Sequence, residues 1–532
     1  MTPNETPVES HPVVVIGGGM AGLSAALHLA DRGLRPLVLE ADPDYYGGRV
    51  AGGDTVTLSH AGQTWHFRGE HGVHGIWSAY RNLQAMLTRY NIRPMFVPAQ
   101  EENWIYKRHG RFRQAAVGST IRHSWVPAPL HFLALFIRPR FLGTLGWRDW
   151  LNLPRVWYSL ALALGIDPLY EGQPLQGLCL GDFIKNWPPA LRAIFIGLSR
   201  NFLSAHPQET PLSGFIGFLR FYMLLRRDAW AFSYMPDDGG TSMIEPLVNK
   251  LYEKGQALGL SKSGATALGC SVTHLSREAD GWRVHWRETQ AKQERPPQST
   301  LARQVILAVD ASNAEKILCA SPDISATAAD LYWPRAMPTA VIRLWFDRAP
   351  DTDVEAGIFS GECILDNYFW LHRLQNAYIE WHRATGGAAI EVHVYGPPEL
   401  LQAPDAVLLS RAINDVNGAF PELRGHIIHQ VIQHNDPTHT VFGVGPPGGQ
   451  HLTVTTPWPD LFCCGDWVRY PSPALFLERA CITGIAAANA VLTTHGLSPW
   501  PLLAPPPPER LAGWIQQLML RGRRARRRRV AR

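Results

Sequence analysis

The sequence predicts an α/β protein with two or more domains, and three observations predict it. The 532 residues are 46% hydrophobic, which is enough for more than one core. Short apolar runs typical of buried strands are followed by helix-like segments near both ends of the chain. The 47 glycines and 42 prolines are scattered between these segments, as expected for many short connections.

The first unit is a strand, a glycine loop and a helix near the N-terminus. Residues 11–16 predict a buried parallel strand, and residues 23–29 predict an apolar helix. Gly17, Gly19 and Gly22 form the pattern GxGxxG between them. Glycine permits a tight turn at the first position, close approach of a pyrophosphate at the second, and close packing of helix and strand at the third. The free amides of the helix N-terminus would then face the phosphates.

A second strand, residues 35–40, ends in Glu40. A carboxylate at this distance from the glycine loop can accept hydrogen bonds from both ribose hydroxyls of a dinucleotide. Strand, loop, helix and acid together predict a dinucleotide site, and the acid disfavours a phosphorylated ribose.

A Gly-Gly-Arg turn follows soon after this acid and is completed by Gly48 and Arg49. An arginine here could neutralise a phosphate through two hydrogen bonds. The turn resembles the continuation found in the amine oxidase and phytoene desaturase superfamily of flavoproteins, where it runs along the pyrophosphate and the flavin. This resemblance implies FAD rather than NAD, and a Rossmann domain of the glutathione reductase type.

The far end of the chain resembles the last FAD motif of the same superfamily. An apolar run leads into Gly465 and Asp466, and residues 474–492 predict a helix rich in small residues. The resemblance implies that Asp466 binds the ribityl or pyrophosphate part of FAD. In the same way, a valine backbone from a central block contacts adenine in this superfamily, and Val272 is the matching position. A plain buried αβ unit is the alternative for the C-terminal segment.

These motifs predict a FAD domain assembled from discontinuous segments, residues 12–92, 236–322 and 441–496. The intervening residues, 93–235 and 323–440, would form an inserted α+β substrate domain. Three runs in the second insertion have strand character and could form a sheet floor, namely residues 339–346, 378–382 and 389–395.

The net charge of +5 originates in a basic C-terminal tail, residues 509–532. The last twelve residues carry eight arginines and no acid, so the rest of the chain has a charge of 5 − 8 = −3. Such a tail could bind anionic lipid, or it could be a solvated, disordered terminus. No nucleic-acid partner is expected, because the body has no reader motif and no basic stripe with interleaved aromatic residues.

The first insertion is unusually aromatic and apolar between residues 131 and 166, and arginines punctuate it. No predominantly apolar run reaches the ~20 residues that a transmembrane helix needs. The segment therefore predicts either peripheral contact with a membrane surface or a buried helical layer. Seven cysteines, an odd number without a CxxC pair, suit a reducing compartment, so we expect a cytoplasmic protein, with peripheral contact on the inner membrane surface as an option.

The segment from residue 65 to residue 90 points to the substrate. It contains the pattern E-x-G-x-H-x5-Y-x-N-L, whose residues are Glu70, Gly72, His74, Tyr80, Asn82 and Leu83. The pattern resembles the N-terminal signature of carotene desaturases, and the phrase around Asp466 and Glu478 is closer to carotenoid ring desaturase/methyltransferases of the isorenieratene synthase type. The resemblance implies an FAD-dependent oxidoreductase that desaturates a carotenoid by hydride transfer to flavin N5. Isomerisation or ring methyl migration are alternative outcomes, and a quinone or oxygen would be the electron acceptor.

Glu70, His71 and His74 are candidate catalytic residues, because a buried carboxylate and imidazole near a flavin could stabilise positive charge or move a proton. In the alternative, Glu70 caps the following helix and the histidines pack beneath the flavin. An iron site formed by His66, Glu70 and His74 is disfavoured, because flavin already supplies the redox function and nothing else donates ligands. No metal is expected.

Two other functions stay open. A flavin amine oxidase would usually place a lysine near flavin N5 from a substrate-domain strand. The candidate strand, residues 339–346, offers Arg343 there and no lysine, which weakens this alternative and makes Arg343 a candidate catalytic residue. The other alternative is a non-catalytic flavoprotein that binds a partner or a membrane through its basic tail.

Overall fold

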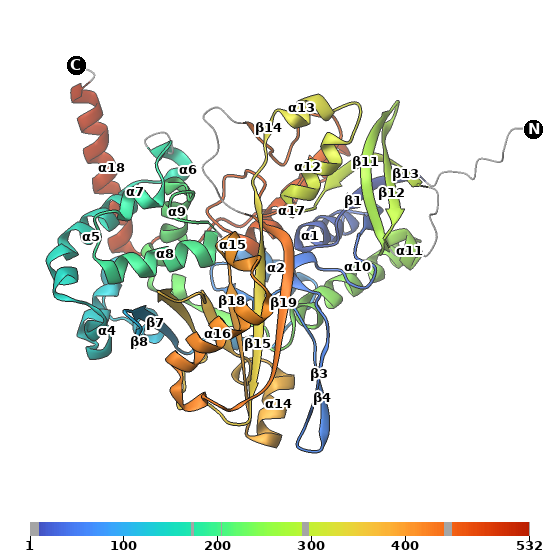
Figure 1. Cartoon of the computed structure of the whole chain (residues 1–532). Coiled ribbons are helices and arrows are strands. Elements are labelled where there is room, and N and C mark those ends of the chain that lie inside the picture. Colours follow the sequence, from blue (N-terminus) through green and yellow to red (C-terminus); the bar gives the residue numbers. More distant parts are fainter. Residues whose placement is uncertain (1–9, 172–174, 204, 290–296, 441–449, 531–532) are drawn as a thin grey trace, which may run out of the picture.

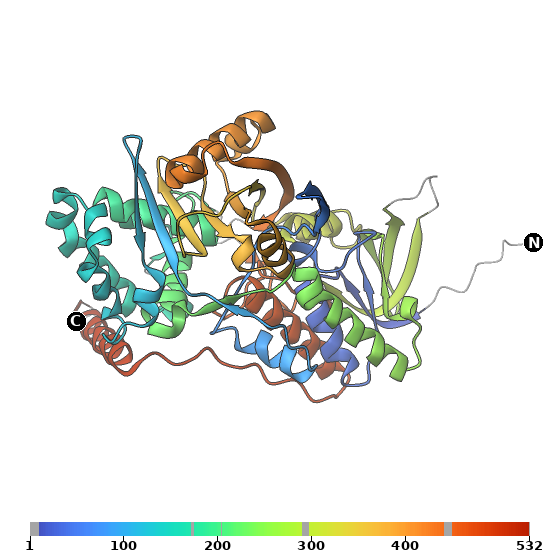
Figure 2. The same ribbon diagram turned by 90° about the horizontal axis from the view of Figure 1, so that it is seen from below.

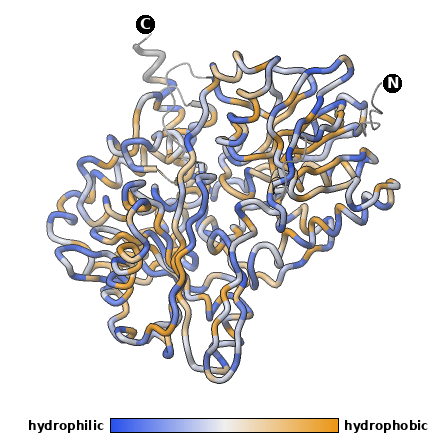
Figure 3. Tube along the Cα trace, turned by 45° about the vertical axis from the view of Figure 1, so that its right-hand side comes forward, coloured by the Kyte–Doolittle hydropathy of each residue, from blue (hydrophilic) through white to orange (hydrophobic). Residues whose placement is uncertain are grey.

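The computed structural model describes residues 10–171, 175–203, 205–289, 297–440 and 450–530. It has a nucleotide-binding part with β1 and α1, a central sheet with β15, β18 and β19, and a helical lobe that includes α4, α5 and α8 (Figure 1). Hydrophobic residues gather along the strands in the middle of the molecule (Figure 3). The start of the third expected FAD segment, residues 441–449, and the last two residues of the tail lie outside the described residues.

The first sheet has seven strands in the order β10-β2-β1-β13-β12-β11, with β21 paired to β13. Its strands are β1 (Ser10–Ile16), β2 (Pro36–Leu39), β10 (Thr266–Ala267), β11 (Cys270–Glu278), β12 (Gly281–Glu288), β13 (Gln298–Leu307) and β21 (Leu461–Cys463). β1 pairs with β2 and with β13 in parallel, and β13 pairs with β21 in parallel. At one edge, β11 and β12 form an antiparallel hairpin, and β12 pairs antiparallel with β13. Strands from three distant parts of the chain thus share one sheet. Val13, Val14 and Val15 are fully buried, as a parallel strand covered on both faces requires.

Helices α1 (Met20–Ala30), α10 (Glu245–Ala257) and α17 (Phe476–Thr494) pack together beside this sheet. α1 is buried along its whole length. The remaining short elements of this part are η6 (Gly240–Ile244), α11 (Lys262–Ala265), α12 (Ala311–Cys319), α13 (Ser325–Ala329), β14 (Leu331–Tyr332) and β20 (Gln450–His451).

The second sheet has the order β19-β15-β18-β17-β16-β7-β8 and combines both inserted segments. Its strands are β7 (Glu102–Arg108), β8 (Arg111–Ala116), β15 (Ala336–Phe346), β16 (Ala356–Gly361), β17 (Asn367–Trp370), β18 (Ala388–Val394) and β19 (Ile427–Thr440). Helix α16 (Asp405–Ala419) and the short helix α15 (Pro398–Leu401) lie beside it. Two of the three expected strands, those near residues 339–346 and 389–395, are present.

The third expected strand, residues 378–382, is wrong: these residues lie in helix α14 (Asn376–Thr385). Tyr378 and Trp381 are buried while the residues between them are more exposed, which is the spacing of one helix face and not of a strand. The ring of Tyr378 stacks on Phe67 with 4.3 Å between the ring centres, so packing on the β4 (Gln63–Phe67) hairpin holds this helix face.

Short elements connect the nucleotide-binding part to the second sheet. They are the hairpin of β3 (Val56–His60) with β4, the three-stranded sheet of β5 (Gly75–Trp77), β9 (Phe232–Tyr234) and β6 (Val97–Pro98), and helix α2 (Arg81–Arg89). The loop between β4 and β5 carries the expected catalytic candidates at residues 70–74.

The helical lobe is built mostly from the first insertion. Its elements are α3 (Gly118–Arg122), η2 (Leu130–Ile137), α4 (Pro139–Thr144), α5 (Trp147–Gly165), α6 (Pro168–Glu171), α7 (Leu180–Ile184), α8 (Pro189–Leu203), α9 (Leu212–Leu219), η4 (Arg220–Leu224) and η5 (Arg227–Trp230).

The basic tail forms a helix, α18 (Arg510–Val530), that packs against α5, so it is not an irregular terminus. The chain reaches this place in an extended stretch that runs along the lower edge of the view in Figure 2. Leu503 N donates to Asn82 Oδ1 at 2.8 Å, which holds the stretch against α2. Glu509 accepts hydrogen bonds from the backbone of Arg227 and Ala128 and so anchors the start of α18 to the lobe.

Glu478, in the first turn of α17, links this helix to Asn82 of α2, which lies 396 residues earlier in the chain. Its carboxylate accepts from Asn82 N at 2.9 Å, Asn82 Nδ2 at 2.8 Å and Leu83 N at 2.9 Å, and it is 2% exposed. It therefore caps α2 from a distant segment. Of the described helices, α17 alone has the length and apolar character to cross a membrane, and 61% of the relevant stretch is buried in the protein, as in a core helix.

We expect the substitution Glu478→Ala to destabilise the protein by about 3 kcal/mol, because it leaves three buried donors without their acceptor. The matched control is Glu253→Ala on α10, which removes only an exposed pair with Lys250 and should cost less than about 0.5 kcal/mol. Urea unfolding followed by circular dichroism measures both. Equal unfolding midpoints for the two variants would contradict the capping role.

Candidate functional site

A cavity of about 1350 Å³ runs from the glycine loop, past the 70–74 loop, into the helical lobe. A pocket for one drug-sized ligand typically has roughly 300–1,000 Å³. The space is therefore large enough for a nucleotide cofactor together with a second, sizeable ligand.

The three glycines of the loop after β1 have different physical requirements. Gly17 has a φ of +106°, and a Cβ there would lie 2.7 Å from the oxygen of Ala308. A Cβ on Gly22 would lie 2.0 Å from the Gly17 oxygen, so only glycine lets α1 pack this closely. Gly19 has nothing nearer than 3.8 Å and lines the cavity, so it leaves room for a ligand to approach the backbone.

Glu40 and Val272 line the same end of the cavity. Glu40 Oε2 accepts from Gly18 N at 2.7 Å and Oε1 accepts from Asp42 N at 2.9 Å, which fixes the carboxylate at the end of β2. Burial raises the pKa of Glu40, and the backbone donors oppose this shift. Val272 lies on β11 next to an irregularity in the pairing with β12.

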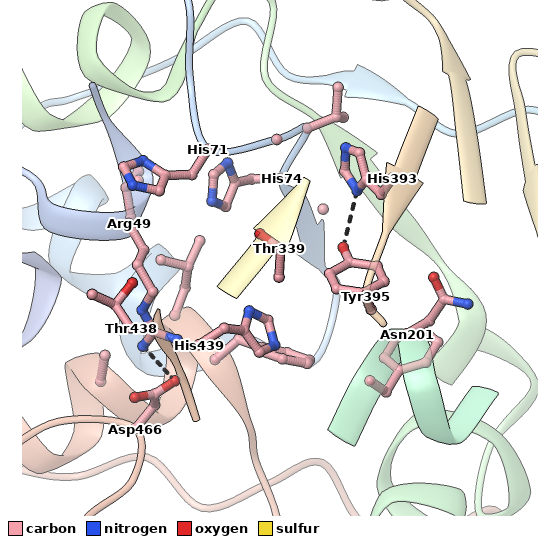
Figure 4. A pocket seen from close by; sticks show the side chains of 18 of the residues that line it. Arg49, His71, His74, Asn201, Thr339, His393, Tyr395, Thr438, His439 and Asp466 are labelled. Atoms are coloured by element: carbon pink, nitrogen blue, oxygen red, sulfur yellow. Dashed lines mark hydrogen bonds and ion pairs between the residues drawn. The ribbon is translucent and has the colours of Figure 1, made fainter. Parts of the chain in front are cut away.

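Arg49 and Asp466 form an ion pair of 2.6 Å that lines the cavity (Figure 4). Burial disfavours the guanidinium charge, but Asp466 outweighs it and raises the pKa of Arg49. The two residues come from the first and last FAD motifs. Both are preceded by glycines with positive φ, +52° at Gly48 and +145° at Gly465, which bring the two backbones to the cavity.

Three histidines gather further along the cavity. Figure 4 shows His71, His74 and His439 around the space next to Arg49. The ring of His71 is 3.1 Å from the oxygen of Ala51, and burial lowers its pKa to about 4. Burial, assisted by the charge of Arg49, lowers the pKa of His439 to about 3. Both imidazoles are therefore neutral near pH 7.

Glu70 does not line this cavity but lies behind it. It accepts from Gly239 N at 3.0 Å and from Gln375 Nε2 at 2.7 Å, and His74 Nδ1 is 3.6 Å away. Gly239 precedes η6, so Glu70 caps a helix, but not α2, the helix that follows it in sequence. The residue that caps α2 is Glu478.

Arg343 also lies behind the cavity. Its Nε donates to Glu391 Oε2 at 2.7 Å, and its Nη2 donates to the backbone carbonyl oxygen of Glu70 at 2.9 Å. The side chain is 3% exposed. Arg343 therefore joins β18 to the 70–74 loop and positions the histidines of that loop.

The sequence prediction missed three neighbouring polar side chains, Glu391, His393 and Tyr395. They alternate along β18 and its first following residue, and the last two line the cavity. The alternation E-x-H-x-Y was visible in a run already identified as a strand, but nothing local showed that it faces the cofactor end.

The far arm of the cavity is almost entirely apolar. Its lining residues are supplied by the helical lobe and neighbouring strands and include Trp104, Phe132, Phe136, Phe141, Leu153, Trp157, Leu160, Leu191, Phe195, Phe202, Leu219, Met223 and Phe232. Glu102 is the acid in this arm. Burial raises its pKa to about 7, although Arg122 binds both of its oxygens at 2.8 Å.

His66, considered as an iron ligand with Glu70 and His74, lies in the β3–β4 hairpin, where its Nδ1 is 3.2 Å from Thr57 Oγ1. Across the described residues, no group of three potential ligands is arranged to hold a metal ion.

Two protein-family models match the chain. Residues 15–90 match an NAD(P)-binding Rossmann-like domain, and residues 188–492 match the flavin containing amine oxidoreductases. The second match covers more than half of the chain, which therefore belongs to the flavin containing amine oxidoreductase family.

Curated relatives and a solved structure agree with this family. A carotenoid phi-ring synthase of Streptomyces griseus is 27% identical, over 91% of this chain and 88% of that protein. A 15-cis-phytoene desaturase of Narcissus pseudonarcissus is 20% identical, over 78% of this chain and 67% of that protein. Cyclohexylamine oxidase from Brevibacterium oxydans has a similar fold, with a TM-score of 0.59, 14% identity, and coverage of 92% and 100%.

The family confirms the resemblance to the amine oxidase and phytoene desaturase superfamily, and the α/β fold with a Rossmann domain. It also shows that the protein is an FAD-dependent oxidoreductase. The cavity fits FAD, because the open face of Gly19, the acid at the end of β2 and the Arg49–Asp466 pair all line it.

We expect Gly22→Ala to lose most of its FAD, because the added Cβ would force α1 away from the glycine loop. Gly143→Ala is the control, since a Cβ there meets nothing within 4 Å. Flavin absorbance per mole of purified protein measures the difference. Full flavin content in Gly22→Ala would show that the loop tolerates the displacement and is not the pyrophosphate site.

Proposed function

We propose that this protein desaturates a carotenoid with FAD, and that it acts on the ring end of the molecule. The observation that supports this most strongly is the single cavity that joins the FAD end to a long apolar arm. The whole-length similarity to a carotenoid phi-ring synthase supports the ring as the site of reaction.

The arm suits a long hydrocarbon. Its walls carry aromatic and aliphatic side chains, which can bury a polyene but offer almost no hydrogen bonds to a polar substrate. The polar side chains gather at the other end, around His71, His74 and Tyr395. A substrate in the arm would therefore present one terminus to the flavin.

The cofactor supplies a hydride acceptor at flavin N5. The protein orients the terminal ring through the arm and keeps water from a cationic transition state. Neutral His71 and His439 would not repel positive charge on the substrate, since both keep pKa values far below 7. A base then takes the second hydrogen as a proton, and the acceptor that reoxidises the cofactor would be a quinone or oxygen.

An amine oxidase on the same fold is the second candidate. The observation that counts against it is the position of Arg343, which is tied to Glu391 behind the cavity. Of the described residues that line the cavity, Lys316 on α12 is the only lysine, and it lies near the nucleotide end with Asn313 and Asp310.

The test is incubation of the FAD-loaded protein in detergent with a linear and a β-ringed carotene, with a quinone or oxygen present. We expect conversion of the ringed carotene, with loss of two hydrogens for each new double bond, seen by absorption and mass spectrometry. Flavin-depleted Gly22→Ala is the negative control. No pigment change, combined with peroxide release on an amine panel, would overturn the proposal in favour of an amine oxidase.

We also propose that the helical lobe docks on a membrane surface, from which an apolar substrate could enter the arm. Helix α5 lines the arm with Leu153 and Trp157, and its other face exposes Trp147 at 68% and Leu151 at 71%. Helix α18 packs beside it and exposes Trp514 at 60%. Exposed aromatic residues next to an arginine-rich helix are typical of interfacial attachment.

Two variants separate the apolar and the charged contributions to this attachment. Trp147→Ser combined with Trp514→Ser should weaken binding to both phosphatidylcholine and phosphatidylglycerol vesicles. Deletion of residues 521–532 should weaken binding only to the anionic vesicles, by roughly tenfold or more, because each arginine near the surface contributes ~1 kcal/mol. Met95→Ser, which changes an exposed apolar residue outside these helices, is the control. Unchanged vesicle sedimentation of both variants would contradict the docking surface.

A further inference from the structure

Glu391, His393 and Tyr395 form a continuous hydrogen-bonded chain that ends at the cavity. The spacing of two along β18 places the three side chains on one face of the sheet. Glu391 Oε1 lies 2.7 Å from His393 Nε2, and His393 Nδ1 lies 2.9 Å from the Tyr395 hydroxyl. Figure 4 shows the last two residues across the cavity from His71 and next to His74 and Thr339.

The residues that contact Glu391 determine which atoms of the Glu391–His393–Tyr395 chain carry protons. Burial disfavours its charge, but the nearby charge of Arg343 and the donors His393 and Val73 N outweigh burial and lower the pKa of Glu391 to about 2. An ionised carboxylate only accepts hydrogen bonds, so His393 Nε2 must donate. When the His393 ring carries this single proton, its Nδ1 is an acceptor, and the Tyr395 hydroxyl can donate to it.

We propose that Tyr395 is the proton acceptor of the reaction, with His393 and Glu391 as positioning residues that receive and stabilise the proton it gives up. This assignment rests on the proposed carotenoid desaturation. The arrangement is a phenol–imidazole–carboxylate relay. In it, the imidazole accepts the proton of the hydroxyl, and the buried carboxylate orients the imidazole and stabilises its charge.

The electrons and protons balance in one desaturation step. One carbon of the substrate loses a hydride, which carries two electrons, to FAD. The adjacent carbon loses its hydrogen as a proton to the Tyr395 oxygen while the phenol proton moves to His393 Nδ1, and the carbon–carbon double bond forms. The imidazolium then returns its proton to the phenol, which releases one to water, and a quinone or oxygen reoxidises the cofactor.

The other imidazoles in the cavity are less suited to take this proton. A charge on His71 or His439 would be unfavourable next to Arg49, which already contributes to the lowered pKa of each. His74 Nδ1 lies 3.6 Å from the nearest oxygen of Glu70, which is beyond hydrogen-bonding distance. An imidazolium at His393 instead forms against the ionised Glu391 at 2.7 Å.

The proton assignment is tested first, on the full-length FAD-loaded protein without substrate, by NMR of ¹⁵N-labelled histidine. The signals of His393 are identified by their loss in His393→Gln. We expect a protonated Nε2 and an unprotonated Nδ1, and a change in both signals in Glu391→Gln, which makes the carboxylate a neutral amide. A protonated Nδ1 in the wild-type protein would overturn the relay, because the phenol could then not donate to His393.

The catalytic role is tested with Tyr395→Phe, which keeps the ring and removes only the hydroxyl. We expect carotene conversion to fall at least about 100-fold, the loss typical of a general base, while FAD content and carotene binding stay within twofold. Tyr106→Phe on β7, outside the cavity lining, is the control. Conversion by Tyr395→Phe at the wild-type rate, or a loss of FAD equal to the loss of conversion, would overturn the role.

These two measurements separate the relay from the proposed function. If the wild-type protein converts no carotene, the proposed function fails, and with it the role of Tyr395 in desaturation. The NMR result still decides whether the relay exists in the protein. If the wild-type protein converts carotene and Tyr395→Phe does so equally, the inference fails and the proposed function stands.

Discussion

Glu391 carries a charge inside the protein, where it is 1% exposed, and three elements meet at its carboxylate. Arg343 reaches it from β15, Val73 from the 70–74 loop, and His393 from its own strand. Isolated burial of such a charge would cost several kcal/mol, and it is tolerated because every oxygen is paired. The position of the loop against the sheet, and with it the position of the cavity histidines, depends on this group.

The same group explains why two residues that look catalytic in the sequence are placed behind the cavity. Arg343 donates to Glu391, Gln433 and the Glu70 backbone, and its side chain does not line the cavity. The carboxylate of Glu70 accepts hydrogen bonds from Gly239 and Gln375. This scaffold holds three of the polar residues that line the cavity, His71 and His74 from the loop and His393 from the sheet.

The parts of the structure that could be predicted are those whose signal is local. The glycine loop, the acid at Glu40 and the alternating hydrophobic runs each depend on neighbours in sequence, and they predict the Rossmann part and a dinucleotide. The choice of FAD rests on the resemblance at Gly48 and Arg49 and at Gly465 and Asp466. That the relay faces the cavity could not be predicted, because the contact between Glu391 and the 70–74 loop joins it to Val73, 318 residues away, and only the folded sheet brings them together. Helix α14 was missed for a similar reason: Tyr378 and Trp381 are buried by the β4 hairpin, which the local pattern does not contain.

The pattern E-x-G-x-H-x5-Y-x-N-L is mostly a scaffold signature. Its acid, Glu70, holds η6 through Gly239, and Asn82 and Leu83 bind the carboxylate of Glu478 on α17. The histidine His74 and the tyrosine Tyr80 line the cavity. A match to this pattern therefore indicates how the FAD part is joined to the substrate part, and it constrains the reaction much less. For the carotenoid substrate that we propose, the choice between a linear polyene and a ring would depend on the apolar arm and on the residues at its flavin end, which the pattern does not include.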